Sequence, residues 1–175
     1  MRQNITAKTY HLRHLVDEDR VLLAADVSPQ HELAMLITRR LLRNLVSALA
    51  KMVSDRAAQM GPLRDTILDF EHANSVAAAF SQGYIRDQNR NPGQLAAPLR
   101  LVQEIKVVAR KDGGVSLGFD NREHLLTIEV AADRIHMVIE TFLQIAERAG
   151  WDFPPIASWL EGSKNVVIPE GHSVN

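Results

Sequence analysis

Apolar and polar residues alternate along the chain with two different spacings, and each change of spacing marks a change of element. From residue 99 to residue 110 the spacing is two, which is typical of a strand with one buried face. The apolar positions are Leu101, Ile105 and Val107, and the polar positions are Arg100, Glu104, Lys106 and Arg110. Two more strands follow up to Val130, after turns at Asp112-Gly113-Gly114 and residues 120–123. The pattern therefore predicts three strands over residues 99–130.

Beyond Val130 the spacing changes to three and four, which is the spacing of an amphipathic helix. The apolar positions are Ile135, Val138, Ile139, Phe142, Ala146 and Ala149. We expect a long helix over residues 131–150, ended by Gly150, because glycine readily adopts the left-handed conformation that follows many helices.

The first part of the chain shows the same succession. Period-two alternation predicts three strands over residues 10–38, which begin near Tyr10, Val21 and Leu33. Turns between them are expected at residues 17–19 (Asp-Glu-Asp) and 28–30 (Ser-Pro-Gln).

A helix pair is predicted over residues 39–84, divided at Gly61-Pro62. The apolar face of the first helix is Leu41, Leu42, Leu45, Val46, Leu49, Met52 and Val53. The apolar face of the second is Leu63, Ile67, Phe70, Ala73, Ala77, Phe80 and Tyr84. We expect both faces to be buried. Residues 85–98, which are rich in Asn, Gly and Pro, are predicted to form a loop.

The two parts of the chain echo each other. Val21 and Val115 are 94 positions apart, and Leu33 and Leu126 are 93 apart. Both parts give strand, turn, strand and helix, through a pseudo-symmetric fold or a coincidence of common ββα units. We expect one α+β domain over residues 1–175, with two three-stranded antiparallel meanders in one sheet or a sandwich, an inserted helix pair and a long C-terminal helix.

Composition and charge exclude several classes of protein. The chain has 175 residues, 46% of them hydrophobic, which is enough for one domain with a full core. Its net charge of −1 gives no global attraction to nucleic acid or to anionic lipid. It contains no cysteine, no apolar run long enough to span a membrane and no signal-peptide pattern, so we expect a cytoplasmic protein.

One row of residues on the second helix resembles part of a metal site. Asp69 and His72 are three positions apart on one helical face, as in di-iron bundles, and Asp65 extends the row. However, Asp65 and His72 lie away from the predicted apolar face, and no facing helix supplies a Glu-x-x-His motif. A solvated face is therefore expected, with a metal- or small-molecule-binding enzyme as the alternative.

Other catalytic patterns are absent from the sequence. His31-Glu32 is followed at position 35 by methionine, so the two-histidine zinc motif is incomplete. No nucleophile elbow, phosphate-binding loop or dinucleotide fingerprint occurs. His136 has no evident partner, and we expect it at the surface. The sequence favours a non-catalytic protein without a cofactor.

A basic row on the first helix is a candidate contact for phosphates. It consists of Arg39, Arg40, Arg43 and Lys51. Cations on an exposed helix face ordinarily serve solubility, and no aromatic residue suited to base stacking lies beside them. A nucleic-acid accessory role is therefore a further alternative.

The segment after Gly150 (residues 151–175) is aromatic at its start. Trp151, Phe153 and Trp159 lie close to a pair of prolines, and large aromatic residues near a chain end often anchor a second subunit or partner. In the alternative interpretation they fold back and cap the core. Val166, Val167 and Ile168 are a candidate edge strand.

The order of elements over residues 10–150 resembles that of the head domain of eukaryotic DNA end-joining scaffold proteins. The resemblance implies a β-sandwich with a helix-turn-helix insertion and a dimerising helix. In that family the helix continues into a coiled-coil stalk, whereas here it ends at Gly150, so a stalk-based role is not implied. The segments ITRRLL and LDFEHANS are similar to stretches of uncharacterised bacterial proteins. We expect a bacterial interaction or scaffold protein that forms a homodimer.

Overall fold

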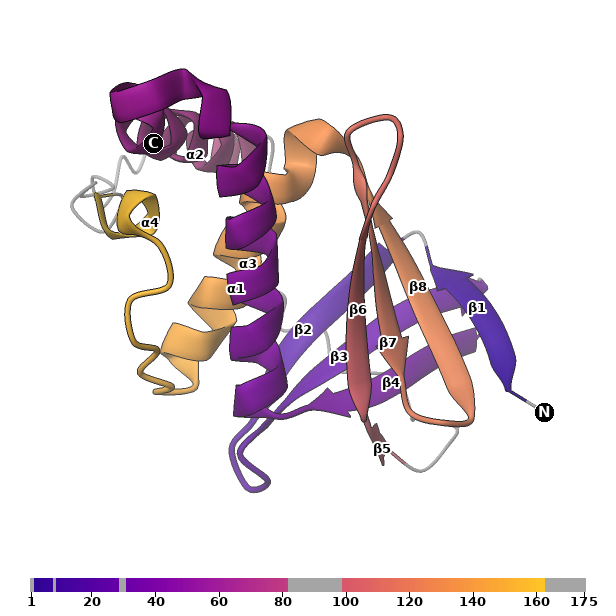
Figure 1. The fold of residues 1–175 in the computed structure, drawn as a ribbon. Helices are drawn as coiled ribbons and strands as arrows, with labels where there is room; N and C mark the ends of the chain where they lie inside the picture. The colour runs from indigo at the N-terminus through magenta and orange to yellow at the C-terminus, as the bar shows by residue number, and fades with distance from the viewer. Residues whose placement is uncertain (1, 8, 29–30, 82–98, 163–175) are drawn as a thin grey trace, which may run out of the picture.

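Two three-stranded antiparallel meanders form the framework of the molecule, as the period-two pattern predicts. The computed structural model describes residues 2–7, 9–28, 31–81 and 99–162. The first meander consists of β2 (Thr9–Leu15), β3 (Arg20–Ser28) and β4 (His31–Ile37). The second consists of β6 (Glu104–Ala109), β7 (Val115–Asp120) and β8 (His124–Val130). With the helices described below, they give the α+β class expected from the sequence (Figure 1).

Each meander is extended by a strand from the other half of the chain. β1 (Gln3–Ala7) pairs in parallel with β8, and the short β5 (Arg100–Leu101) pairs in parallel with β4. The two four-stranded sheets therefore have the orders β1-β8-β7-β6 and β2-β3-β4-β5. In each half, the strand that precedes the meander joins the sheet of the opposite half. We call this arrangement the strand exchange.

The strand registers make the two halves equivalent in detail. In the first sheet Leu23 of β3 lies opposite Met35 of β4, and in the second Leu117 of β7 lies opposite Ile128 of β8. These pairs have the same 94- and 93-position spacing as the sequence echo. All four side chains are buried. The pseudo-symmetric alternative therefore describes the fold. The sequence echo arises because equivalent positions in the two halves carry buried apolar side chains.

Within the described residues, six helical segments lie between the two meanders or after the second. They are α1 (Arg39–Arg56), the 3-10 helix η1 (Ala58–Leu63), α2 (Arg64–Ser81), the 3-10 turn η2 (Ala132–Arg134) with α3 (Ile135–Arg148), and α4 (Ser158–Gly162). The Thr38 hydroxyl accepts a hydrogen bond from the backbone N–H of Leu41, which caps the start of α1. Among the described residues, no helix combines the length and apolarity needed to cross a membrane.

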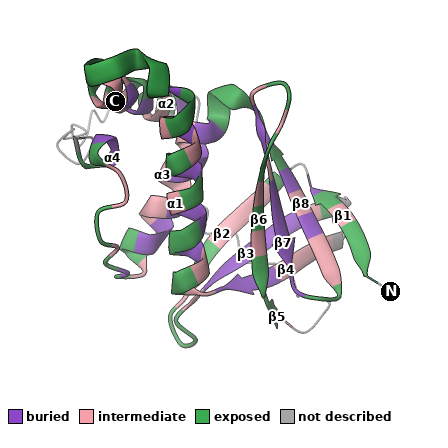
Figure 2. Cartoon of the chain, viewed as in Figure 1, coloured by how far each residue is buried: buried purple, intermediate pink, exposed green. Residues whose placement is uncertain are grey.

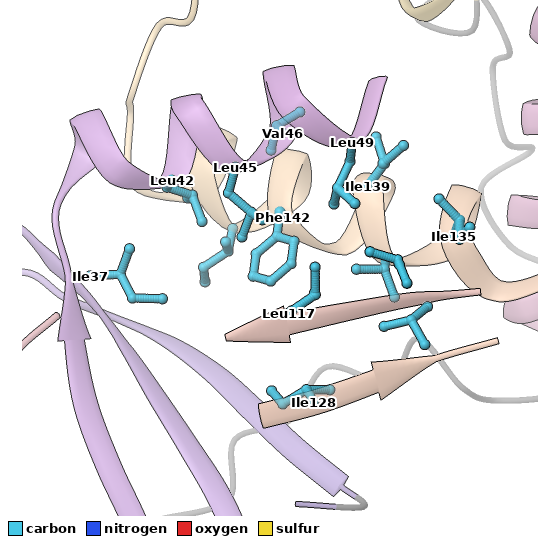
Figure 3. Packing of buried hydrophobic residues seen from close by; sticks show 14 of the residues in the cluster. Ile37, Leu42, Leu45, Val46, Leu49, Leu117, Ile128, Ile135, Ile139 and Phe142 are labelled. Carbon is cyan, nitrogen blue, oxygen red and sulfur yellow. The ribbon is translucent and has the colours of Figure 1, made fainter. Parts of the chain in front are cut away.

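The hydrophobic core lies between the helices and the two sheets. Figure 3 shows Leu42 and Leu45 of α1 and Phe142 of α3 pointing toward the strands. α1 packs against β6 and α3 packs against β2, so the helix of each half contacts the edge strand of the other meander. Figure 2 shows that the buried residues of α1 and α3 face inward while the outer faces are exposed. The predicted apolar faces of these two helices are thus confirmed.

The second helix of the predicted pair, α2, exposes the side that was predicted to be buried. Leu63 and Phe70, which we expected to be buried, are 64% and 67% exposed. The side of α2 that packs against the protein instead carries Leu68, His72 and Ala79. The predicted apolar face of this helix was therefore wrong, because a stripe read from one helix cannot show which side its neighbours occupy.

Other differences from the sequence predictions are local. β1 was not predicted, and the first strand expected within residues 99–110 is divided between β5 and β6, which belong to different sheets. The buried Val102 lies at the division, where its N–H donates to the carbonyl oxygen of Leu36. The 85–98 loop, the end of the second helix at Tyr84 and the 166–168 strand lie outside the described residues.

Candidate functional site

The end of α3 directs the aromatic segment back onto the molecule. Gly150 has φ of +66°, and its N–H donates to the carbonyl oxygen of Glu147. The N–H of Trp151 donates to the carbonyl oxygen of Ala146. This pair of hydrogen bonds is a Schellman motif, which confirms the predicted role of Gly150. Trp151 is consequently buried, and its indole N–H donates to Asp19 Oδ1 at 2.6 Å.

The rest of the aromatic segment returns across the helices. Phe153 is partly buried against the core. Trp159, on α4, is 2% exposed and donates its indole N–H to Ser54 Oγ of α1 at 3.0 Å. The hydroxyl of Ser158 donates to Asp65 of α2. The three predicted anchors thus contact the chain's own core, as in the alternative interpretation that they cap it.

Trp159 covers two histidines that the sequence analysis placed at the surface. His72 of α2 is 1% exposed, and its Nδ1 lies 3.3 Å from Nδ1 of His136 on α3. Its Nε2 lies 3.3 Å from Glu140 Oε2, one turn further along α3. Both imidazole rings meet the Trp159 ring edge-to-face, with centroids 5.5 Å apart. We call His72, His136, Glu140 and Trp159 the histidine cluster.

The electrostatics of the histidine cluster favour an ionised Glu140 and a neutral His136. Burial, together with the charge on His72, lowers the pKa of His136 from 6.5 to about 4. Burial alone would raise the pKa of Glu140, but hydrogen bonds from His72 and Gln144 and the charge of His72 outweigh it and lower that pKa. Glu140 is therefore a carboxylate and His136 is neutral at physiological pH.

The predicted metal row does not converge on one point. Asp65 is bound to Arg64 and Ser158, whereas the nitrogens of His72 face α3. Asp69 Oδ1 is buried with no hydrogen-bond partner among the described residues. No group of three or more potential ligands in the described part of the chain has the geometry to hold a metal ion. The expectation that His72 lies on a solvated face was also wrong.

Two residues of the basic row on α1 have partners within the protein, and the other two are exposed to solvent. Arg39 donates to the backbone carbonyl oxygen of Asp152 at 2.5 Å, and Lys51 pairs with Asp55 at 2.6 Å. Arg40 and Arg43 are exposed, and neither forms an ion pair within the described residues. Two of the four predicted phosphate contacts thus have structural partners, and two are open to solvent.

The exposed large apolar side chains of the described helices lie on η1 and on the outer side of α2. Met60, Leu63 and Phe70 are 44%, 64% and 67% exposed, and Ile67 lies between Leu63 and Phe70 on the same side. Ala77 continues this side one further double turn along the helix and is also exposed. We call these five residues the α2 stripe. Four of them, all except Met60, belong to the face that the sequence pattern marks as apolar.

The sequence contains one local sign of the histidine cluster, but its meaning becomes clear only from the packing of the helices. His136 and Glu140 are four positions apart on one helix, so they share a side. Their partner His72 is 64 positions before His136, and nothing in the local pattern links the two helices. Trp159 was identified, but its partners were not.

The chain was also compared with known proteins. No protein-family model matches it, and no curated protein or solved structure is significantly similar to it. Its function therefore has to be inferred from the geometry of its own residues.

Proposed function

We propose that this chain is a non-catalytic interaction protein that forms a homodimer through the α2 stripe. The observation that carries the proposal is the exposure of Phe70, a large aromatic side chain that is two-thirds open to water in the middle of an apolar helix face. An exposed apolar patch of this kind commonly marks a protein–protein contact. The aromatic segment is not the contact we propose, because Trp151 and Trp159 are buried within the chain.

The spacing of the α2 stripe suits packing against another helix. Leu63, Phe70 and Ala77 recur every seven residues, and Ile67 fills the gap between the first two. This is the repeat by which side chains of one helix insert between those of a neighbour. The inner side of α2 is already occupied by α3 and α4, so a new helix can approach only from the outside.

A second copy of the chain fits the stripe. In an antiparallel pair with its twofold axis between Ile67 and Leu68, Phe70 of each copy enters the space between Leu63 and Ile67 of the other. The same register brings Arg64 of each copy level with Glu71 of the other. Residues with opposite charges thus flank the contact.

The overall charge also allows self-association. The chain carries 20 basic and 21 acidic residues, so two copies do not repel each other strongly. The absence of cysteine suits a reducing cytoplasm, where we propose that the dimer acts as a scaffold.

The proposal predicts that Phe70→Ser dissociates the dimer. Burial of one phenylalanine contributes about 1.5–3 kcal/mol, and the symmetric contact buries two, so the dissociation constant should rise by at least about 100-fold. Sedimentation equilibrium of the full chain over a range of concentrations measures this change.

Val16→Ser provides a matched control. Val16 is 77% exposed in the turn between β2 and β3, so its substitution removes an equally exposed apolar side chain far along the chain from α2. The control should leave the dissociation constant unchanged. A wild-type chain that stays monomeric at every concentration, or a dimer equally sensitive to both substitutions, would contradict the proposed function.

A further inference from the structure

We propose that His72, His136 and Glu140 form an acid-sensitive latch, which holds α2 and α4 against α3 at neutral pH and releases Trp159 to solvent on acidification. The latch uses the inner side of α2, whereas the proposed dimer uses the α2 stripe on its outer side. It therefore stands independently of the dimer.

The geometry joins three helices through one imidazole. His72 projects from α2 and meets two groups of α3, His136 through Nδ1 and Glu140 through Nε2, each at 3.3 Å. Trp159 brings α4 onto both rings and is itself tied to α1 through Ser54. α2, α3 and α4 converge in this way on the side of the molecule away from the sheets (Figure 1).

The hydrogen-bond chain accommodates one proton but not two. When His72 is neutral, its Nε2–H donates to Glu140 and its Nδ1 accepts from Nδ1–H of His136. When His72 is protonated, it donates from both nitrogens, and neutral His136 accepts at Nδ1 in its other tautomer. When His136 is also protonated, two N–H donors and two positive charges face each other. The hydrogen bond between the imidazoles is then lost, and repulsion replaces it.

The other charged groups on the neighbouring helices make no described contact with either imidazole. On α2, Asp65 is engaged by Arg64 and Ser158, and Asp69 lies one turn before His72. On α1, Asp55 is paired with Lys51. On α4, Glu161 is exposed. Glu140 is the one carboxylate in the described contacts of either imidazole, and it faces Nε2 of His72 rather than His136.

The direction of the pH effect follows from His136. Its pKa is about 4 in the closed cluster, against 6.5 for the free side chain, so an open form binds the proton more readily than the closed form. The contribution of His136 to the stability of the closed form is therefore fully present above about pH 6.5, and it decreases as the pH falls from 6.5 toward 4. α2 packs mainly against helices, so it can move without breaking a sheet.

Tryptophan fluorescence of the full chain tests the latch. In a Trp151→Phe background, Trp159 is the sole tryptophan, and its emission can be excited selectively. Between about pH 7.5 and about pH 4.5 its emission should shift to the red and its quenching by acrylamide should rise at least about twofold, while the far-UV circular dichroism of the sheets persists. His136→Gln, which cannot take up the second proton, should abolish the transition. His14→Gln, the control at a histidine outside the cluster, should leave it in place.

Three results would overturn the latch. The first is Trp159 emission that does not change over this pH range. The second is a His136→Gln variant that shows the same transition as its parent. The third is a loss of sheet signal that coincides with the change in emission, which would indicate global unfolding. If the Trp151→Phe variant does not fold, hydrogen exchange of the wild-type chain decides the question. The latch then requires acid-induced loss of protection in α2 and α4 with β3 and β7 unchanged.

Discussion

At the scale of single residues, two buried polar side chains, those of Asp120 and Asn121, accept hydrogen bonds from backbone N–H groups of one turn. Asn121, 7% exposed, accepts hydrogen bonds at Oδ1 from the backbone N–H groups of Glu123 and His124. Asp120 beside it accepts one from the N–H of Arg122 and pairs with Arg2, the residue before β1. The turn between β7 and β8 is therefore fixed by two side chains, and one of them also holds the start of the chain.

Asn121→Ala should lower the free energy of unfolding by about 1–3 kcal/mol, because two backbone donors lose their shared acceptor. Asn121→Asp keeps an acceptor oxygen at that position and should lose less than half as much. Urea unfolding followed by circular dichroism measures both. Equal losses in the two variants would show that the side-chain amide group, rather than its oxygen, fixes the turn.

His72 shows where residue-level prediction from the sequence stops. The Asp-x-x-His spacing was recognised, but its chemistry depends on His136 and Glu140, which belong to another helix. Gly150 could be assigned its conformation from the sequence because the signal is local: a helical stripe that ends in glycine. Long-range polar contacts leave no such periodic trace.

At the scale of elements, the strands and helices with one apolar, buried side were predicted well. Elements that lack an apolar side, or whose apolar side is not the buried one, were not. β7 and α3 carry one clear apolar side, which the structure confirms. β1 (Gln-Asn-Ile-Thr-Ala) has a mostly exposed pattern and only one large apolar residue, so it gives little periodic signal. α2 has an apolar stripe on one side and a buried histidine on the other, and the sequence pattern identified only the stripe.

The Schellman motif after α3 provides an element-level prediction. Gly150→Ala should destabilise the protein by about 1 kcal/mol, because a side chain is strained at φ of +66°. No atom lies within 4 Å of the position where a Cβ would be added, so the loss reflects backbone strain alone. Gly150→Asn should cost less, since asparagine tolerates this conformation. Urea unfolding would contradict this explanation if the two variants were equally stable.

At the scale of the whole molecule, the strand exchange makes each half incomplete without the other. β1 completes the sheet of the second half, and β5 completes that of the first. The helices cross over in the same manner, since α1 packs on β6 and α3 packs on β2. The two sheets and the single core are therefore one cooperative unit, although the sequence echo alone would also fit two separate ββα units.

A chain divided between residues 81 and 99 tests this interdependence. Fragments 1–81 and 99–175 should each lack a cooperative unfolding transition when alone, because each has lost a strand and half of the core. When mixed, they should form a 1:1 complex with the circular dichroism of the intact chain. A sigmoidal urea transition of either isolated fragment would show that the half can fold by itself.

The strand exchange also bears on how the chain is made. Gln3 pairs with His124, so β1 leaves the ribosome well before its partner strand, which follows only after more than a hundred further residues have been added. At about 5–20 residues per second, this delay is roughly 6 to 24 s. During that time β1 has no partner strand. The edge of β4 also stays unpaired until residues 100–101 have been added. The first sheet is therefore completed only when β5 emerges, and the second only when β8 emerges, so the native fold is acquired late in synthesis.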